Sequence, residues 1–121
     1  MTKLKRSRCA ILPLTLKSEW YDMIASGAKM EEYRTSKRVL AMIDKWYGHC
    51  KINGRKPIVQ FFDGYRKRRN SMTILVDYVC DRDVCFNPGW GEPNDPHYVL
   101  SLGAKVIVVN ESGGQHEPRE E

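Results

Sequence analysis

Three ionisable side chains, Lys29, Glu32 and Arg34, lie within six residues of one another. An ammonium and a guanidinium can hold a phosphate or a base carbonyl, and the planar Arg group offers two parallel donors. A carboxylate between them can accept from an exocyclic amine or act as a general base. A surface ion pair, worth at most about 1 kcal/mol, would explain one Glu–Arg pair but less well the crowding of charge over residues 29–34. The residue types alone leave the two interpretations equal.

A short helix followed by a strand is expected to position these groups. Apolar residues of the segment 18–26 fall at helical spacing, and Gly27 is a natural residue to end the helix in a left-handed turn. The following residues indicate a strand in which Glu32 and Arg34 share one face, with Lys29 entering from the turn. Opposite charges that a helix end and a strand place this close together favour a polar site over a solvated surface.

The segment resembles the G-x-K-x-x-E-x-R signature of the ASCH domain, a family with the PUA-like β-barrel fold. The match consists of Gly27, Lys29, Glu32 and Arg34. The resemblance covers about residues 11–109 and looks most like the small stand-alone ASCH proteins of phage and bacterial genomes. It also includes the segments Leu12-Pro13-Leu14, Phe62-Asp63-Gly64-Tyr65 and Tyr98-Val99-Leu100-Ser101-Leu102-Gly103.

This resemblance implies an α+β fold, a PUA-like curved β-barrel of about five to six strands with two helices packed against it. It also implies that the matching residues line a cleft between barrel and helices. One branch of the family is similar to amidohydrolases that remove an acyl group from acylated cytidine, with a lysine where Lys29 stands and a threonine nucleophile where Glu32 stands. A carboxylate cannot replace that hydroxyl in the same covalent chemistry, so this chain departs from that branch.

The rest of the chain divides into short β-rich runs and one further helix, which favours an α+β domain. Thr35 or Ser36 is expected to cap the second helix and Gly48 to end it. The first strand is placed at an edge because it contains a proline, and the run 72–79 at the centre because both of its faces are apolar. Besides the signature strand, the expected strands cover residues 10–16, 58–62, 72–79, 98–102 and 105–109.

A basic turn is the second candidate for binding, and it consists of Tyr65, Arg66, Lys67, Arg68 and Arg69. Four consecutive cations suit a phosphate backbone, and the adjacent tyrosine can stack on a base. A solvated turn between two strands is the alternative, but no acid within the run balances its charge, which favours binding. Contacts of this kind supply affinity and salt dependence rather than sequence specificity.

Aromatic residues give a third candidate. Trp90 lies between two glycines in the loop 87–96, where it can form a lid or stacking platform, or equally plug one end of a barrel. Trp20 and Trp46 fall on apolar helix faces and are expected in the core. No histidine has a visible catalytic partner.

The 121 residues suffice for one domain, which we place at 10–110 between a basic arm (1–9) and a disordered acidic tail (111–121). The net charge of +5 points to an anionic partner. No apolar run approaches the length of a membrane span and no signal peptide is recognised, so a cytoplasmic protein without a membrane partner is expected. The four cysteines lack a paired C-x-x-C motif, so reduced thiols are favoured over a zinc site, and neither metal nor cofactor is expected.

Two functions of different classes follow. The first is a non-catalytic module that binds RNA or single-stranded nucleic acid, or a nucleoside or nucleotide, through the cleft and the basic turn. The second is a small hydrolase, either an amidohydrolase on a modified nucleoside or a ribonuclease, in which Glu32 activates water and Lys29 stabilises developing negative charge. Asp77 and Glu92 are the candidates for its second acid. A protein-interaction module is a third alternative that no sequence feature selects.

Overall fold

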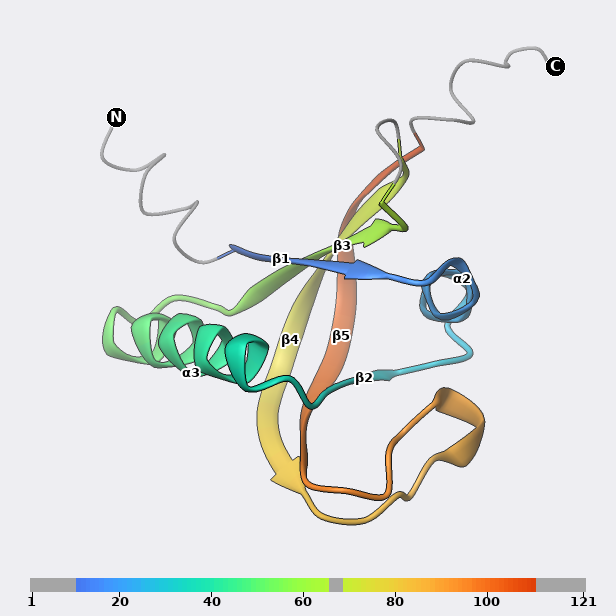
Figure 1. Cartoon of the computed structure of the whole chain (residues 1–121). Coiled ribbons are helices and arrows are strands. Elements are labelled where there is room, and N and C mark those ends of the chain that lie inside the picture. Colours follow the sequence, from blue (N-terminus) through green and yellow to red (C-terminus); the bar gives the residue numbers. More distant parts are fainter. Residues whose placement is uncertain (1–10, 66–68, 111–121) are drawn as a thin grey trace, which may run out of the picture.

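The computed structural model describes residues 11–65 and 69–110, which form one mixed five-stranded sheet and two α-helices. The helices are α2 (Ser18–Ser26) and α3 (Lys37–Ile52), which lie on opposite sides of the strands in Figure 1. A short 3-10 helix, η1 (Pro88–Trp90), lies in the loop after β4. The strands are β1 (Ile11–Leu16), β2 (Glu31–Arg34), β3 (Ile58–Asp63), β4 (Ser71–Arg82) and β5 (His97–Val109).

The two edge strands of the sheet come within side-chain reach of each other. The strand order is β1-β3-β4-β5-β2, with β1 parallel to β3 and all other neighbours antiparallel. Arg34 of β2 nevertheless donates from Nη2 to the Thr15 carbonyl of β1 at 2.9 Å. Within residues 11–65 and 69–110 no backbone ladder joins β1 to β2, so the sheet is open. The α+β class is confirmed, and its described strands do not close into a barrel.

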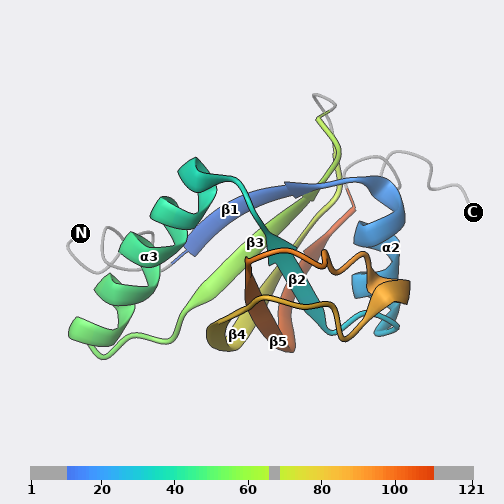
Figure 2. The same ribbon diagram turned by 60° about the horizontal axis from the view of Figure 1, so that its bottom comes forward.

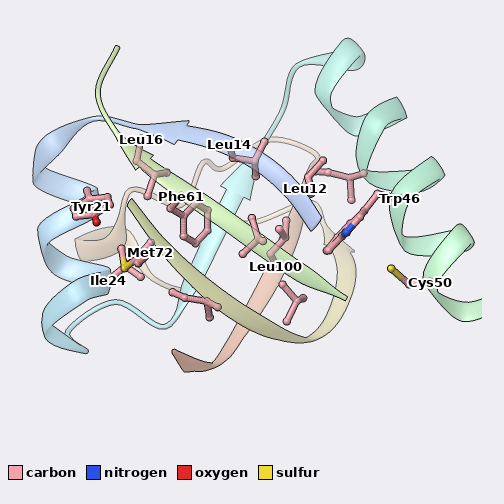
Figure 3. Close-up of a cluster of buried hydrophobic side chains, with 14 residues drawn as sticks. Leu12, Leu14, Leu16, Tyr21, Ile24, Trp46, Cys50, Phe61, Met72 and Leu100 are labelled. Carbon is pink, nitrogen blue, oxygen red and sulfur yellow. The ribbon is translucent and has the colours of Figure 1, made fainter. Parts of the chain in front are cut away.

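Apolar side chains from the sheet and both helices meet in one core (Figure 3). The alternating burial along β1 and β3 follows from the period of two in a strand, which turns every second residue inward. Phe61 and Ile43 are fully buried, and each such side chain contributes roughly 1.5–3 kcal/mol. β1 at the edge and β4 at the centre agree with the sequence prediction.

Helix α3 extends beyond its predicted end at Gly48 and continues to Ile52. The reason is that Cys50 is fully buried and extends the apolar face formed by Ile43 and Trp46. Burial of one more turn outweighs the cost of a glycine inside a helix, which is about 1 kcal/mol.

Strand β5 is continuous where the sequence predicted two strands separated by Gly103. A Cβ at Gly103 would lie 2.6 Å from Oδ1 of Asp77, so this glycine permits close packing against β4 rather than a turn. The pairing of β4 with β5 contains register shifts between Thr73 and Tyr78. These irregularities bend the two-stranded β4–β5 ribbon without interrupting it.

Several expectations concern residues that the structure does not describe. The basic arm at 1–9, the acidic tail at 111–121 and the cations at 66–68 all lie outside the described residues. Of the two described α-helices, neither combines the length and the apolarity needed to cross a bilayer.

Candidate functional site

Glu32 is the centre of a buried ion cluster, which we call the motif cluster and which consists of Lys29, Glu32 and Arg34. Oε1 of Glu32 accepts from Nζ of Lys29 at 3.0 Å, and Oε2 accepts from Nε of Arg34 at 2.8 Å. Lys29 and Glu32 are only 3% and 5% exposed. The three groups that the sequence predicted to act together therefore form one hydrogen-bonded unit. Glu32 and Arg34 lie on the same face of β2, as predicted.

The end of α2 directs Lys29 into this cluster. Gly27 ends the helix in a left-handed conformation, and the N–H of Lys29 donates to the Met23 carbonyl at 3.0 Å, which turns the chain back under the helix. The Lys29 ammonium then lies 4.5 Å from the ring centre of Trp20 and 5.4 Å from that of Tyr33. Aromatic faces attract cations, so two rings and one carboxylate hold this buried charge.

A recess of about 430 Å³ lies beside the motif cluster. Its lining comes from the junction of β1 and α2 (15–17 and Trp20), from 32–34 of β2, and from Gly64 and Tyr65 after β3. In Figure 2, β1 leads directly into α2, and β2 runs between the two α-helices. The recess therefore combines charged groups with aromatic rings on walls supplied by three separate parts of the chain.

Lys29 does not line this recess, contrary to the expectation that all matching residues would share one cleft. Its ammonium lies behind Glu32, and the residue instead lines a smaller hollow of about 150 Å³ beside β5. Trp20 also departs from the prediction, because it is half-buried and forms part of the wall, whereas Trp46 lies in the core as predicted. The amphipathic pattern of α2 could not distinguish a wall position from a core position.

The turn after β3 is fixed by contacts with the start of α2. The N–H of Gly64 donates to the Leu16 carbonyl at 2.8 Å, and the Ser18 hydroxyl donates to Asp63 at 2.5 Å. This anchoring places Tyr65, which is 87% exposed, at the rim of the recess.

Arg69 was predicted to bind phosphate, but it stabilises this turn. It donates to the Gly64 carbonyl at 2.8 Å, and its guanidinium lies 4.2 Å from the centre of the Phe62 ring. The other predicted phosphate contacts, Arg66, Lys67 and Arg68, are not among the described residues.

A second polar network, which sequence analysis missed, ties β2 to β4 and the following loop. We call it the loop network, and its charged centre is Arg82, which pairs with Glu31 at 2.8 Å and with Glu92 at 2.9 Å. Asn87 donates to Glu31 at 3.0 Å, and Nε2 of His97 donates to Glu92 at 2.6 Å. Its members are spread from residue 31 to residue 97, so no local spacing could have revealed them.

Glu92 is fully enclosed and ionised. Burial by itself would raise the pKa of its carboxyl, but hydrogen bonds from His97, from the N–H groups of Phe86 and Asn87, and from Arg82 outweigh this effect. The net result lowers the pKa of Glu92 to about 2. Its hydrogen bonds to Phe86 and Asn87 of the loop, to Arg82 of β4 and to His97 of β5 connect the loop to the sheet.

Glu92 and Asp77, the candidates for a second acid, do not meet the motif cluster. Neither residue lines the recess: Asp77 packs against Gly103 on the β4–β5 ribbon, and Glu92 is enclosed in the loop network. Trp90 does not line the recess either. Among the described residues, no group of three His, Cys, Asp or Glu side chains is placed to hold a metal ion.

Gly91 of this loop lies against Trp20, which is part of the recess wall. Gly91 has a φ of +79°, and a Cβ there would lie 2.7 Å from Cζ2 of the Trp20 ring. Alanine at this position should therefore displace Trp20, with an added backbone cost of about 1–2 kcal/mol for the left-handed conformation. Fluorine NMR of fluorotryptophan-labelled protein, which reports on each of the three tryptophans, should show the Trp20 signal shifted.

The matched control for this prediction is Gly89→Ala, because Gly89 lies in the same loop and nothing is within 4 Å of an added Cβ. Its Trp20 signal should stay in place. An unshifted Trp20 signal in Gly91→Ala would mean that the loop does not position this ring.

Comparisons with protein-family models, with curated proteins and with solved structures gave no match for this chain. The fold and the site define an α+β domain in which a buried ion cluster supports an aromatic recess.

Proposed function

We propose that the recess binds one nucleobase of RNA or single-stranded nucleic acid, or of a nucleoside or nucleotide, and that it does so without catalysis. The observation that carries this proposal is the state of Arg34. Its Nε is bound to Glu32 and its Nη2 to the Thr15 carbonyl, whereas Nη1 has no hydrogen-bond partner among the described residues. The lining thus presents a donor whose orientation is fixed before any ligand arrives, which reduces the entropic cost of binding.

The size and walls of the recess support a planar guest. Its volume of about 430 Å³ lies within the range of small-molecule sites, roughly 300–1,000 Å³. Trp20 stands on one part of the wall and Tyr65 at the rim, and stacking of a base on an aromatic ring contributes about 1–3 kcal/mol. Arg34 can donate to a base carbonyl or a phosphate oxygen in the same space.

The proposal includes membership of the ASCH family with its PUA-like architecture. The residues of its signature that carry charge meet in one cluster, and the Arg34–Thr15 hydrogen bond bridges the two edge strands that a closed barrel would join. In this interpretation the recess occupies the seam between these edges.

Hydrolysis is less well supported than binding. Each carboxylate oxygen of Glu32 already holds a cation, and Lys29 lies behind Glu32, away from the recess where an oxyanion would form. No second acid lines the recess in the part of the chain that the structure describes. The geometry therefore favours a ligand that is held in place over one that is cleaved.

Titration calorimetry with short single-stranded RNA and with mononucleotides tests the binding proposal. Arg34→Ala should weaken binding about tenfold to a hundredfold, because a charged hydrogen bond contributes roughly 1.5–3 kcal/mol. Arg38→Ala removes the same charge from an exposed position on α3 outside the recess and should leave affinity unchanged.

Tyr65→Ala provides an independent test because this exposed side chain contributes little to folding. It should weaken binding about tenfold through lost stacking, while Tyr78→Ala, an exposed tyrosine outside the recess, should not. If RNA and mononucleotides bind Arg34→Ala and Tyr65→Ala as tightly as they bind the unaltered protein, the recess is not the binding site.

A further inference from the structure

We propose that the recess recognises a phosphate group together with the base, through Lys17 and Arg34, so that its ligand is a nucleotide or a nucleic-acid strand and not a neutral nucleoside. This inference rests on the proposed function, because it assumes that a base occupies the recess. It adds that the ligand is negatively charged and that Lys17 and Arg34 contact its phosphate.

The charge balance of the recess is positive. Its charged lining residues are Lys17, Glu32 and Arg34. The carboxylate of Glu32 is hydrogen-bonded to two cations, Lys29 and Arg34, so the motif cluster itself carries one excess positive charge. Lys17 adds a second, and no other carboxylate residue lines the recess within the described chain. A neutral guest would leave both excess charges without a counterion, whereas a phosphate would compensate them.

Lys17 is available for such a contact. It is exposed at the junction of β1 and α2, and within residues 11–65 and 69–110 its ammonium has no hydrogen bond or ion pair. Lysine is a compact charge on a flexible four-carbon stem, so it can follow a phosphate whose position varies with the base. The Arg34 guanidinium, in contrast, is held in one orientation by two hydrogen bonds.

The placement of Lys17 relative to Trp20 links the two parts of the ligand. Lys17 is the N-cap residue of α2, Trp20 lies in the first turn of the helix, and both line the recess. A base stacked on the Trp20 wall would therefore have its own phosphate within range of the Lys17 side chain. An anion without a ring would use Lys17 and Arg34 but leave the aromatic walls without a partner.

The test compares each of the four ribonucleosides with its 5′-monophosphate, and both with inorganic phosphate, by titration calorimetry at low salt. We expect the best nucleotide to bind at least tenfold more tightly than its nucleoside. Lys17→Gln should remove most of that difference without changing nucleoside binding. Lys45→Gln, which removes an exposed lysine of α3 outside the recess, should leave the difference intact.

A second comparison tests a single-stranded nucleic acid as the ligand instead of a mononucleotide. Single-stranded RNA should bind at least tenfold more tightly than a peptide nucleic acid of the same sequence, which has the bases but no phosphates. Lys17→Gln should lower RNA affinity and leave binding of the peptide nucleic acid unchanged.

The outcomes separate this inference from the proposed function. If nucleosides bind as tightly as nucleotides, or the peptide nucleic acid as tightly as RNA, phosphate recognition is wrong but base binding stands. If inorganic phosphate binds as tightly as the best nucleotide, the base contributes nothing and the proposed function fails. Absence of binding by every one of these probes would overturn both.

Discussion

Replacing Glu32 with alanine is expected to lower the free energy of unfolding by about 3–5 kcal/mol, the usual cost of removing one partner from a buried ion pair. Lys29 is 3% exposed and its ammonium is hydrogen-bonded to Oε1 of Glu32, so the change would leave a charge in the interior with only two aromatic rings around it. Domains of this kind are stable by about 5–15 kcal/mol, so the loss is a large part of the total. Urea denaturation followed by circular dichroism measures it.

Two further variants make this prediction specific to the buried pair. Glu19→Ala removes an exposed carboxylate from α2 and should change stability by no more than about 0.5 kcal/mol. The double variant Lys29→Met and Glu32→Leu should recover most of the loss, because both desolvated charges are then absent. A double variant as unstable as Glu32→Ala alone would show that the cost does not arise from the unpaired ammonium of Lys29.

The motif cluster could be predicted from the sequence because it is local. Its residues are separated by two or three positions, and the geometry of a helix end followed by a strand is enough to bring them together. The alternation of a strand placed Glu32 and Arg34 on one face, and their hydrogen bond at 2.8 Å follows directly from it. The edge position of β1 and the central position of β4 were likewise determined by short patterns.

The parts that sequence analysis missed depend on contacts between distant segments. Arg82 is 51 residues from Glu31 along the chain, so their ion pair exists only because the β2–β5 and β4–β5 ladders place β2 and the end of β4 on either side of β5. The wall position of Trp20 depends in the same way on Gly91. Burial of Cys50 determines where α3 ends, and the packing of Asp77 against Gly103 keeps β5 continuous. Local propensity reveals neither contact.

Strand β2 connects the two polar networks. Glu32 and Arg34 project from one face toward β1 and the recess, while Glu31 and Tyr33 hydrogen-bond to each other on the other face, where the loop network lies. A four-residue edge strand has little backbone pairing of its own, and charged edge strands also resist pairing with other chains. Ion pairs on both faces thus fix the strand that carries Arg34, and the recess depends on both networks.

Acidification is expected to release the loop network, and Glu92 is the group that responds. Its pKa is lowered from 4.5 to about 2 in the folded protein, so its contribution to stability is fully present above pH 4.5 and is lost as the pH falls toward 2. The size of the shift corresponds to about 3 kcal/mol. Glu92→Gln should lower the free energy of unfolding by about this amount at pH 6, because an amide cannot accept from Arg82 and His97 as a carboxylate does.

The decisive measurement is the stability difference between the unaltered protein and Glu92→Gln at several pH values between 6 and 2.5, obtained from urea denaturation. The titration of carboxyl groups outside the loop network is the same in the two proteins and cancels in this difference. It should shrink steadily below pH 4.5, since protonation makes the Glu92 side chain neutral, like that of Gln. A difference that is the same at pH 6 and pH 2.5 would mean that the loop is held by packing rather than by the charge of Glu92, and the recess wall at Trp20 would then be expected to persist in acid.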